Sequence, residues 1–221
     1  MPLDQKMGIM HDQAAILKAV LAGYALPEGG IHGKRHWARV LKTGLRIAKA
    51  NGGDPEVVRL FALFHDSRRE NEKRDPDHGL RGAAFARSLR GTLVHLDDAQ
   101  FELLHYACAH HTDGTTSTDP TIGACWDADR LDLGRANIKP NPEFMSTEVG
   151  RKIVGSSWKW VGSRRSISPI LGLDQLGSLD GRISKVPSLM SISFPRCRIA
   201  LATLCSSWKR TALSMSPSRI A

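Results

Sequence analysis

The apolar residues in the first two thirds of this chain recur at three- and four-residue steps, which is the spacing of an amphipathic helix. A first helix is predicted to begin after Asp12, whose side chain can accept backbone hydrogen bonds at a helix start, and to end at the turn-rich residues 25–30. A second helix should contain His36 and end at residues 51–56, where two glycines and a proline interrupt the pattern.

A third helix should follow directly. Asp54 and Pro55 are the residue types expected at a helix N-cap and in its first turn, and apolar residues dominate from there to the adjacent pair His65 and Asp66. Three more helices are predicted over residues 78–89, from residue 97 to about 110, and around residues 122–131. No alternating strand pattern of useful length occurs, so we predict an all-α helical bundle.

The pattern changes beyond about residue 153. The last 66 residues contain fifteen serines and short apolar groups without a sustained period, so they have little means of offsetting the entropy of ordering. We predict a helical domain over residues 1–153 and a basic tail without a stable fold over residues 154–221. Two explanations of the tail stay open: a disordered segment, or a segment translated in a shifted reading frame.

Charge is distributed as unevenly as the serines. The last 66 residues carry ten Lys or Arg and two acids, so they account for most of the formal net charge of +9. Because this excess lies outside the predicted domain, we expect no nucleic-acid polymer as a partner. Four cysteines without a C-x-x-C pair, no secretory signal at the start and no apolar run of about 20 residues predict a cytoplasmic protein without a membrane partner. The oligomeric state stays open.

The predicted domain also holds the residues with metal chemistry. All nine histidines fall within the first 111 residues. Imidazole and carboxylate groups can hold a divalent ion while leaving positions open for water and substrate, so the set predicts a metal hydrolase. In chain order the set is His36, His65, Asp66, His78, His110, His111 and Asp127.

The adjacent His65 and Asp66 can offer a nitrogen and an oxygen to one ion from a helix end. His36 and Asp127 would complete the set from other helices and leave two open positions on an octahedral ion. His32 lies four residues before His36 and can be the ligand in its place.

The segments HWARV from His36, FALFHDSRRE around His65 and Asp66, and CWDADRLDLGR around Asp127 resemble the H...HD...D signature of the HD-domain metal-dependent phosphohydrolases. This resemblance implies an HD-domain helical bundle whose metal is held by those four residues. It also implies cleavage of a phosphomonoester or phosphodiester bond in a small substrate, such as a nucleotide, by attack of metal-bound hydroxide.

The segments HGLRG at His78 and HHTDG at His110 and His111 resemble the positions of additional ligands in binuclear members, including the HD-GYP phosphodiesterases. The GYP part is missing, which disfavours a cyclic-dinucleotide substrate. The implied cofactor is one or two divalent ions of manganese, iron, cobalt, nickel, zinc or magnesium.

Further roles follow from the neighbours of the predicted ligands. Phosphate anchors are expected among Lys34, Arg68, Arg69 and Arg130, with Arg130 preferred. Asp66 would orient the attacking water, Glu70 would assist proton transfer or pair with a nearby cation, and His110 would protonate the leaving group. Asp129 and Asp132 are expected to cap the helix or orient ligand histidines.

Two other functions fit the same residues. A binuclear iron oxygenase would use a similar set of histidines and aspartates on the same scaffold. A regulatory domain would bind a metal without catalysis.

Overall fold

The computed structural model describes residues 12–155, and within this range it is helical without a strand. This confirms the predicted all-α class, while most of the predicted tail lies outside the described residues. The longer helices are α1 (Gln13–Ala22), α2 (Lys34–Asn51), α3 (Pro55–Phe64), α4 (His78–Ser88), α5 (Asp98–His110), α6 (Pro120–Leu131) and α7 (Glu148–Gly155), with short 3-10 helices η1 (Leu133–Ala136) and η2 (Pro142–Phe144).

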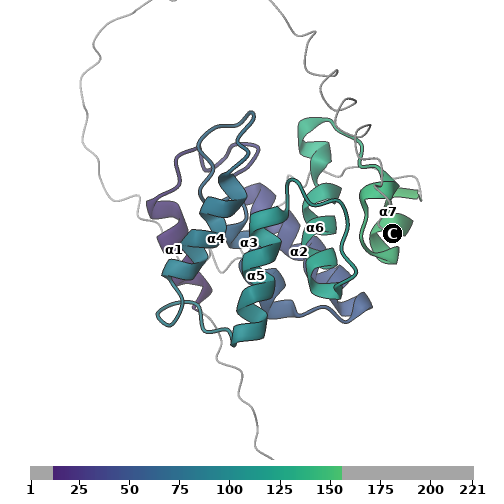
Figure 1. Ribbon diagram of the computed structural model, residues 1–221. Coiled ribbons are helices and arrows are strands. Elements are labelled where there is room, and N and C mark those ends of the chain that lie inside the picture. The colour runs from purple at the N-terminus through teal and green to yellow at the C-terminus, as the bar shows by residue number, and fades with distance from the viewer. Residues whose placement is uncertain (1–11, 156–221) are drawn as a thin grey trace, which may run out of the picture. The chain divides into compact units, whose positions relative to one another are not determined.

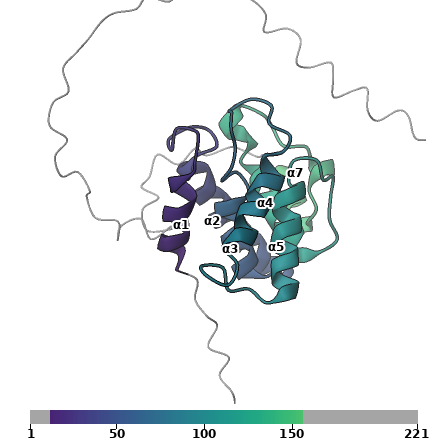
Figure 2. The ribbon, with the colours of Figure 1, turned by 60° about the vertical axis from the view of Figure 1, so that its left-hand side comes forward.

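Helix α3 is the central helix of the bundle. Apart from Arg59, every residue from Val57 to Phe64 is buried, and α3 contacts α1, α2, α4, α5 and α6 (Figures 1 and 2). A helix that is apolar on all sides needs neighbours on all sides. His65 and Asp66 directly follow the last residue of this buried helix, so they lie in the interior, where they are 0% and 1% exposed.

The predicted helix starts are confirmed where the structure describes them. Asp12 accepts a hydrogen bond from the backbone nitrogen of Ala15, and Asp54 caps α3 in the same way. Helix α2 ends at Gly52, which has a φ of 82° that glycine adopts without strain.

Helix α2 packs against α3 and α6 and supplies His36 to the interior. The approach to α3 is close, since a Cβ at Gly44 would lie 2.7 Å from Cγ1 of Val58. Lysines and arginines cover the rest of α2. Among the described helices none is both long and apolar enough to span a membrane.

Helices α4 and α5 pack side by side and bring two more histidines to the end of α3. A Cβ at Gly82 of α4 would lie 2.3 Å from the carbonyl oxygen of Phe64, so only glycine allows this contact. His78 begins α4 and His111 directly follows α5, and this packing places both beside Asp66.

The chain after α6 differs from the sequence-based expectation, which contained no helix there. Helix α7 has eight residues and buries only Gly150 and Val154, so it is too short to give a sustained helical period in the sequence. Polar contacts hold this region: Arg151 donates to the carbonyl oxygens of Met145 and Ser146.

Candidate metal centre

Asp66 stands between two pairs of histidines. Its two carboxylate oxygens face different pairs, which gives two buried groups of three potential ligands that share this one residue. The first group contains His36 and His65, and the second contains His78 and His111. Four segments that are distant in the sequence therefore meet at one carboxylate.

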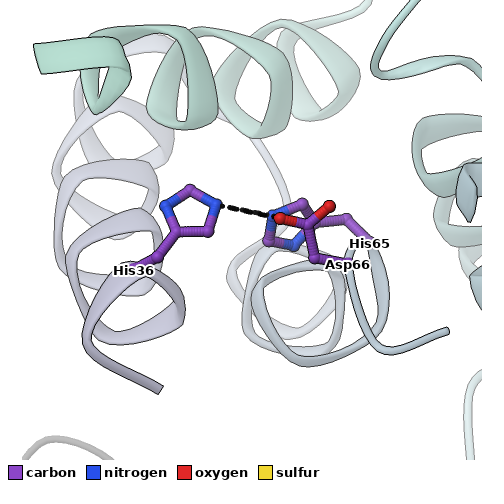
Figure 3. Close-up of side chains that lie close together, drawn as sticks. All are labelled: His36, His65 and Asp66. Atoms are coloured by element: carbon purple, nitrogen blue, oxygen red, sulfur yellow. Dashed lines mark hydrogen bonds and ion pairs between the residues drawn. The ribbon is translucent and has the colours of Figure 1, made fainter. Parts of the chain in front are cut away.

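The first group joins α2 to the end of α3. Nε2 of His36 lies 3.0 Å from Nε2 of His65, and Oδ2 of Asp66 lies 3.4 Å and 3.5 Å from these two nitrogens. Figure 3 shows the three side chains pointing toward one another. Two ligands at right angles, each about 2.1 Å from an ion, are about 3 Å apart, so this spacing suits a divalent ion.

The second group lies on the other side of the carboxylate. Nε2 of His78 is 2.9 Å from Nε2 of His111, and Oδ1 of Asp66 is 3.2 Å and 3.8 Å from them. The guanidinium of Arg69 borders this group, with Nη1 3.0 Å from Nε2 of His78 and 3.5 Å from Oδ1 of Asp66.

Every one of the four histidines is oriented in the same way. The Nδ1 atom donates to a protein oxygen, which leaves Nε2 as the nitrogen that faces the group. Such contacts fix the tautomer and the ring orientation of metal-ligating histidines. The acceptors are Oδ2 of Asp132 for His36 at 2.7 Å, and the backbone carbonyl oxygens of Phe61 for His65 at 3.1 Å, Cys108 for His111 at 2.8 Å and Asp75 for His78.

Three buried carboxylate oxygens in this cluster have no hydrogen-bond partner: both oxygens of Asp66 and Oδ1 of Asp129. Oδ1 of Asp129 lies 3.2 Å from Nε2 of His36 and 4.0 Å from Nε2 of His65. Buried carboxylates are costly unless they are hydrogen-bonded, paired or metal-bound. The donor set therefore fits one or two divalent cations.

The protonation states of the cluster residues also suit the binding of a divalent cation. Burial lowers the pKa of His65 to about 3, so its imidazole is neutral and can be a ligand. Burial alone would raise the pKa of Asp66, but the surrounding histidines, His65 foremost, hold it well below its usual value. Burial and Arg135 oppose protonation of His36, yet nearby acids raise its pKa to about 9, so an ion would displace a proton there.

A comparison with solved structures bears on the fold. A crystal structure of a predicted HD superfamily hydrolase from an uncultured Thermotogales bacterium has a TM-score of 0.56 and 25% sequence identity to this chain. The match covers 80% of this chain and 97% of that one. The chain has the HD-superfamily fold. No family model matches the chain, and no curated protein does either.

Within the HD fold, the aspartate predicted as the fourth ligand is engaged elsewhere. The carboxylate of Asp127 accepts hydrogen bonds from the backbone nitrogens of Ser146 at 2.7 Å and Thr147 at 2.8 Å, and from the Thr147 hydroxyl at 2.7 Å. Residues two apart on a helix are about 200° apart around its axis. Asp129 therefore faces the histidines, and Asp127 holds the segment before α7.

The open alternative between His32 and His36 is resolved by position. His36 belongs to the first ligand group, whereas His32 belongs to neither group among the described residues. His32 pairs through Nδ1 with the carboxylate of Glu72, and its ring centroid lies 6.3 Å from that of His36. His32 is thus a neighbour of the cluster.

The other predicted catalytic residues lie at the surface. The side chain of His110 is 43% exposed and its nearest acid is Asp113, at 3.8 Å. The side chain of Glu70 is 69% exposed and lies 3.5 Å from Nε of Arg81. The structure brings His111, rather than His110, to the ligand cluster, because α5 turns its last residue outward.

Three of the four expected phosphate anchors contact protein groups and not the cluster. Lys34 pairs with Glu28. Arg68 donates to the carbonyl oxygens of Val20 and Ser67, and its guanidinium carbon lies 3.4 Å from the ring centroid of Phe85. The guanidinium of Arg130 donates to three carbonyl oxygens, those of Gly114, Thr115 and Phe144.

Two arginines border the cluster: Arg69, the fourth expected anchor, and Arg135, which the sequence did not indicate. Arg69 lies beside the second group, and Nη2 of Arg135 lies 3.7 Å from Oδ1 of Asp129. Arg69 directly follows Arg68 in the sequence, and only the turn after α3 decides which of them faces inward. Arg135 lies beyond α6 in η1, where no helical pattern indicated its direction.

Proposed function

We propose that this protein is a metal-dependent hydrolase that cleaves a phosphoester bond in a small substrate. The observation that carries the proposal is the position of Asp66: each of its two unpartnered, buried oxygens faces a pair of histidine Nε2 atoms. The likeness to a predicted HD superfamily hydrolase supports the same reaction class.

The residues divide into two ligand sets. His36, His65, Asp66 and Asp129 would hold one ion, and Asp66, His78 and His111 would hold a second. A divalent ion bound there would lower the pKa of a bound water and polarise a phosphoryl oxygen. Asp66 contributes an oxygen to both sets, so it would also orient a water placed between them.

The charges around the cluster favour an anionic substrate. Arg69 lies beside Asp66 and Arg135 beside Asp129. One divalent ion balances the charges of the two aspartates, so the two guanidinium groups and any second ion remain as positive charges that a phosphate can neutralise. A site for a neutral substrate would gain nothing from two arginines in its wall.

The test is elemental analysis of the purified protein, followed by a panel of phosphomonoesters and phosphodiesters with the identified metal. We expect phosphate release by the wild type and its loss in the Asp66→Asn variant. Asp98→Asn is the matched control, because the Asp98 side chain is 95% exposed. Equal turnover in Asp66→Asn and wild type, with the fold verified by circular dichroism, would refute the assignment.

The same preparation separates the two other functions. Oxygen consumption by the iron-loaded protein, with no phosphate released from any ester, would identify an iron oxygenase. Stoichiometric metal with neither activity would identify a regulatory domain.

A further inference from the structure

Arg135 has a largely buried side chain, which is unusual for an arginine. It lies in η1, six residues after Asp129, and its side chain is only 9% exposed. Nη2 is 3.7 Å from Oδ1 of Asp129, and Nη1 is 3.9 Å from Oδ2 of Asp132. Both distances allow attraction between charges but are too long for hydrogen bonds.

The guanidinium therefore keeps donors without acceptors. Nε and Nη1 of Arg135 are buried and have no hydrogen-bond partner. The acid that could accept them is already engaged, since Asp132 accepts from Nε of Arg39 at 2.6 Å and from Nη2 of Arg39 at 2.9 Å. A buried donor that lacks an acceptor costs free energy, so this arrangement favours binding of an external anion.

A second buried donor without a partner is the hydroxyl of Tyr24. The Tyr24 ring packs edge-on against Trp37, the neighbour of His36, with a centroid distance of 5.0 Å. Burial and then the charges of Asp66 and Glu72 raise its pKa, so Tyr24 is a protonated donor at neutral pH. Buried donors without acceptors and buried carboxylate oxygens without hydrogen bonds thus occur around one cluster.

A metal phosphate complex would satisfy both sets of groups. The oxygens of Asp66 and Asp129 that lack hydrogen bonds would coordinate the cation. The phosphoryl oxygens would accept hydrogen bonds from the N–H and O–H groups that lack acceptors. On the basis of the hydrolase function proposed above, we propose that Arg135 binds the phosphoryl group of the substrate on the Asp129 side of the site, with Tyr24 as a second donor. The substrate in this proposal is a phosphomonoester.

The preference for a monoester follows from charge. A phosphomonoester carries close to two negative charges at neutral pH, whereas a diester carries one. Asp132 is paired with Arg39, one divalent ion would balance the charges of Asp66 and Asp129, and a second ion would add two further positive charges. Arg69 and Arg135 then match a dianion better than a monoanion.

The experiment is isothermal titration of inorganic phosphate into the metal-loaded protein, which reports on Arg135 whether or not the protein hydrolyses an ester. The Arg135→Gln variant is expected to keep the metal content of the wild type and to bind phosphate at least about tenfold more weakly. Tyr24→Phe should weaken binding by about threefold to tenfold. Arg35→Gln is the matched control, because Arg35 is exposed although it adjoins His36.

Arg135→Lys provides a second variant that keeps the charge if the glutamine variant folds poorly. It should bind phosphate more weakly than the wild type, because an ammonium does not reproduce the guanidinium donors. Unchanged phosphate affinity in either Arg135 variant would overturn the proposal. Loss of phosphate binding that merely follows loss of the metal would also overturn it, since Arg135 would then support the ligands and not the substrate.

If the wild type binds phosphate but hydrolyses no ester, the hydrolase function fails while the anion site stands. If it hydrolyses monoesters and diesters with equal kcat/KM, the proposed monoester preference is wrong, while the hydrolase function and the anion site stand.

Discussion

Oδ2 of Asp132 accepts the Nδ1 hydrogen of His36 at 2.7 Å, and this contact turns Nε2 of His36 toward the unpartnered oxygen of Asp129, 3.2 Å away. The ring is fully buried, so it has no solvent contact to replace this hydrogen bond. Asp132 therefore determines which nitrogen of His36 is offered to an ion.

Replacing Asp132 by Asn should weaken metal binding without removing a ligand. We expect a metal affinity about 10-fold to 100-fold lower, measured by competition with a chelator. Asp98→Asn, at an exposed position, should leave the affinity unchanged. Wild-type affinity in Asp132→Asn would show that His36 is held by packing alone.

Asp127 and Asp129 should separate into a structural and a metal-binding role. Asp129→Asn should lower the metal content, since the oxygen that faces His36 loses its charge. Asp127→Asn should keep the metal and lower the free energy of unfolding by about 1–3 kcal/mol, because its carboxylate accepts three hydrogen bonds from Ser146 and Thr147. Elemental analysis and urea denaturation measure the two effects.

The reverse result for this pair would restore the assignment made from the sequence. That result is metal loss in Asp127→Asn with full occupancy in Asp129→Asn.

The adjacent residues His110 and His111, at the end of α5, allow a direct comparison of metal stoichiometry. His111→Ala removes a member of the second ligand group and should reduce the saturating metal content from two ions to one per chain. His110→Ala should change nothing, since His110 is half-exposed and lies outside both groups. Equal stoichiometry in the two variants would exclude a separate second site.

Asp75 should make the fold sensitive to acid. Its two oxygens each lie 2.7 Å from Nη2 of Arg81, and one accepts from the backbone nitrogen of Glu70 at 2.8 Å. Burial opposes ionisation, but these partners hold the pKa of Asp75 below its usual value. The stabilisation is therefore complete above the unfolded-state pKa of about 3.9 and is lost as the pH falls through the lower folded-state pKa.

Asp75→Asn should accordingly unfold at a lower urea concentration than the wild type at pH 7. The difference between the two proteins should shrink as the pH falls below about 4. A difference that stays constant from pH 7 to pH 3 would mean that the Asp75 charge does not stabilise the fold.

The helices could be predicted from the sequence because their signals are local. The apolar run of α3 and its Asp54 cap predict a buried helix, and the same run predicts that His65 and Asp66 end inside the protein. The structure shows α3 buried and both residues at its end buried as well.

The side chains that complete the site could not be selected in this way. Asp127 and Asp129 both lie on α6, and the choice between them depends on the rotation of that helix about its axis. Arg130 was expected to face a phosphate but donates to carbonyl oxygens of the loop after α5 and of η2, whose positions the local pattern does not define. Such choices are made by packing between distant segments.

The most direct test of the shared role of Asp66 is anomalous diffraction from crystals soaked in manganese. Two peaks are expected, one between Oδ2 of Asp66 and the Nε2 atoms of His36 and His65, and one between Oδ1 and the Nε2 atoms of His78 and His111. Each peak should lie about 2.0–2.4 Å from its ligands. Manganese-soaked crystals with these side chains ordered and no anomalous density at either position would contradict the account.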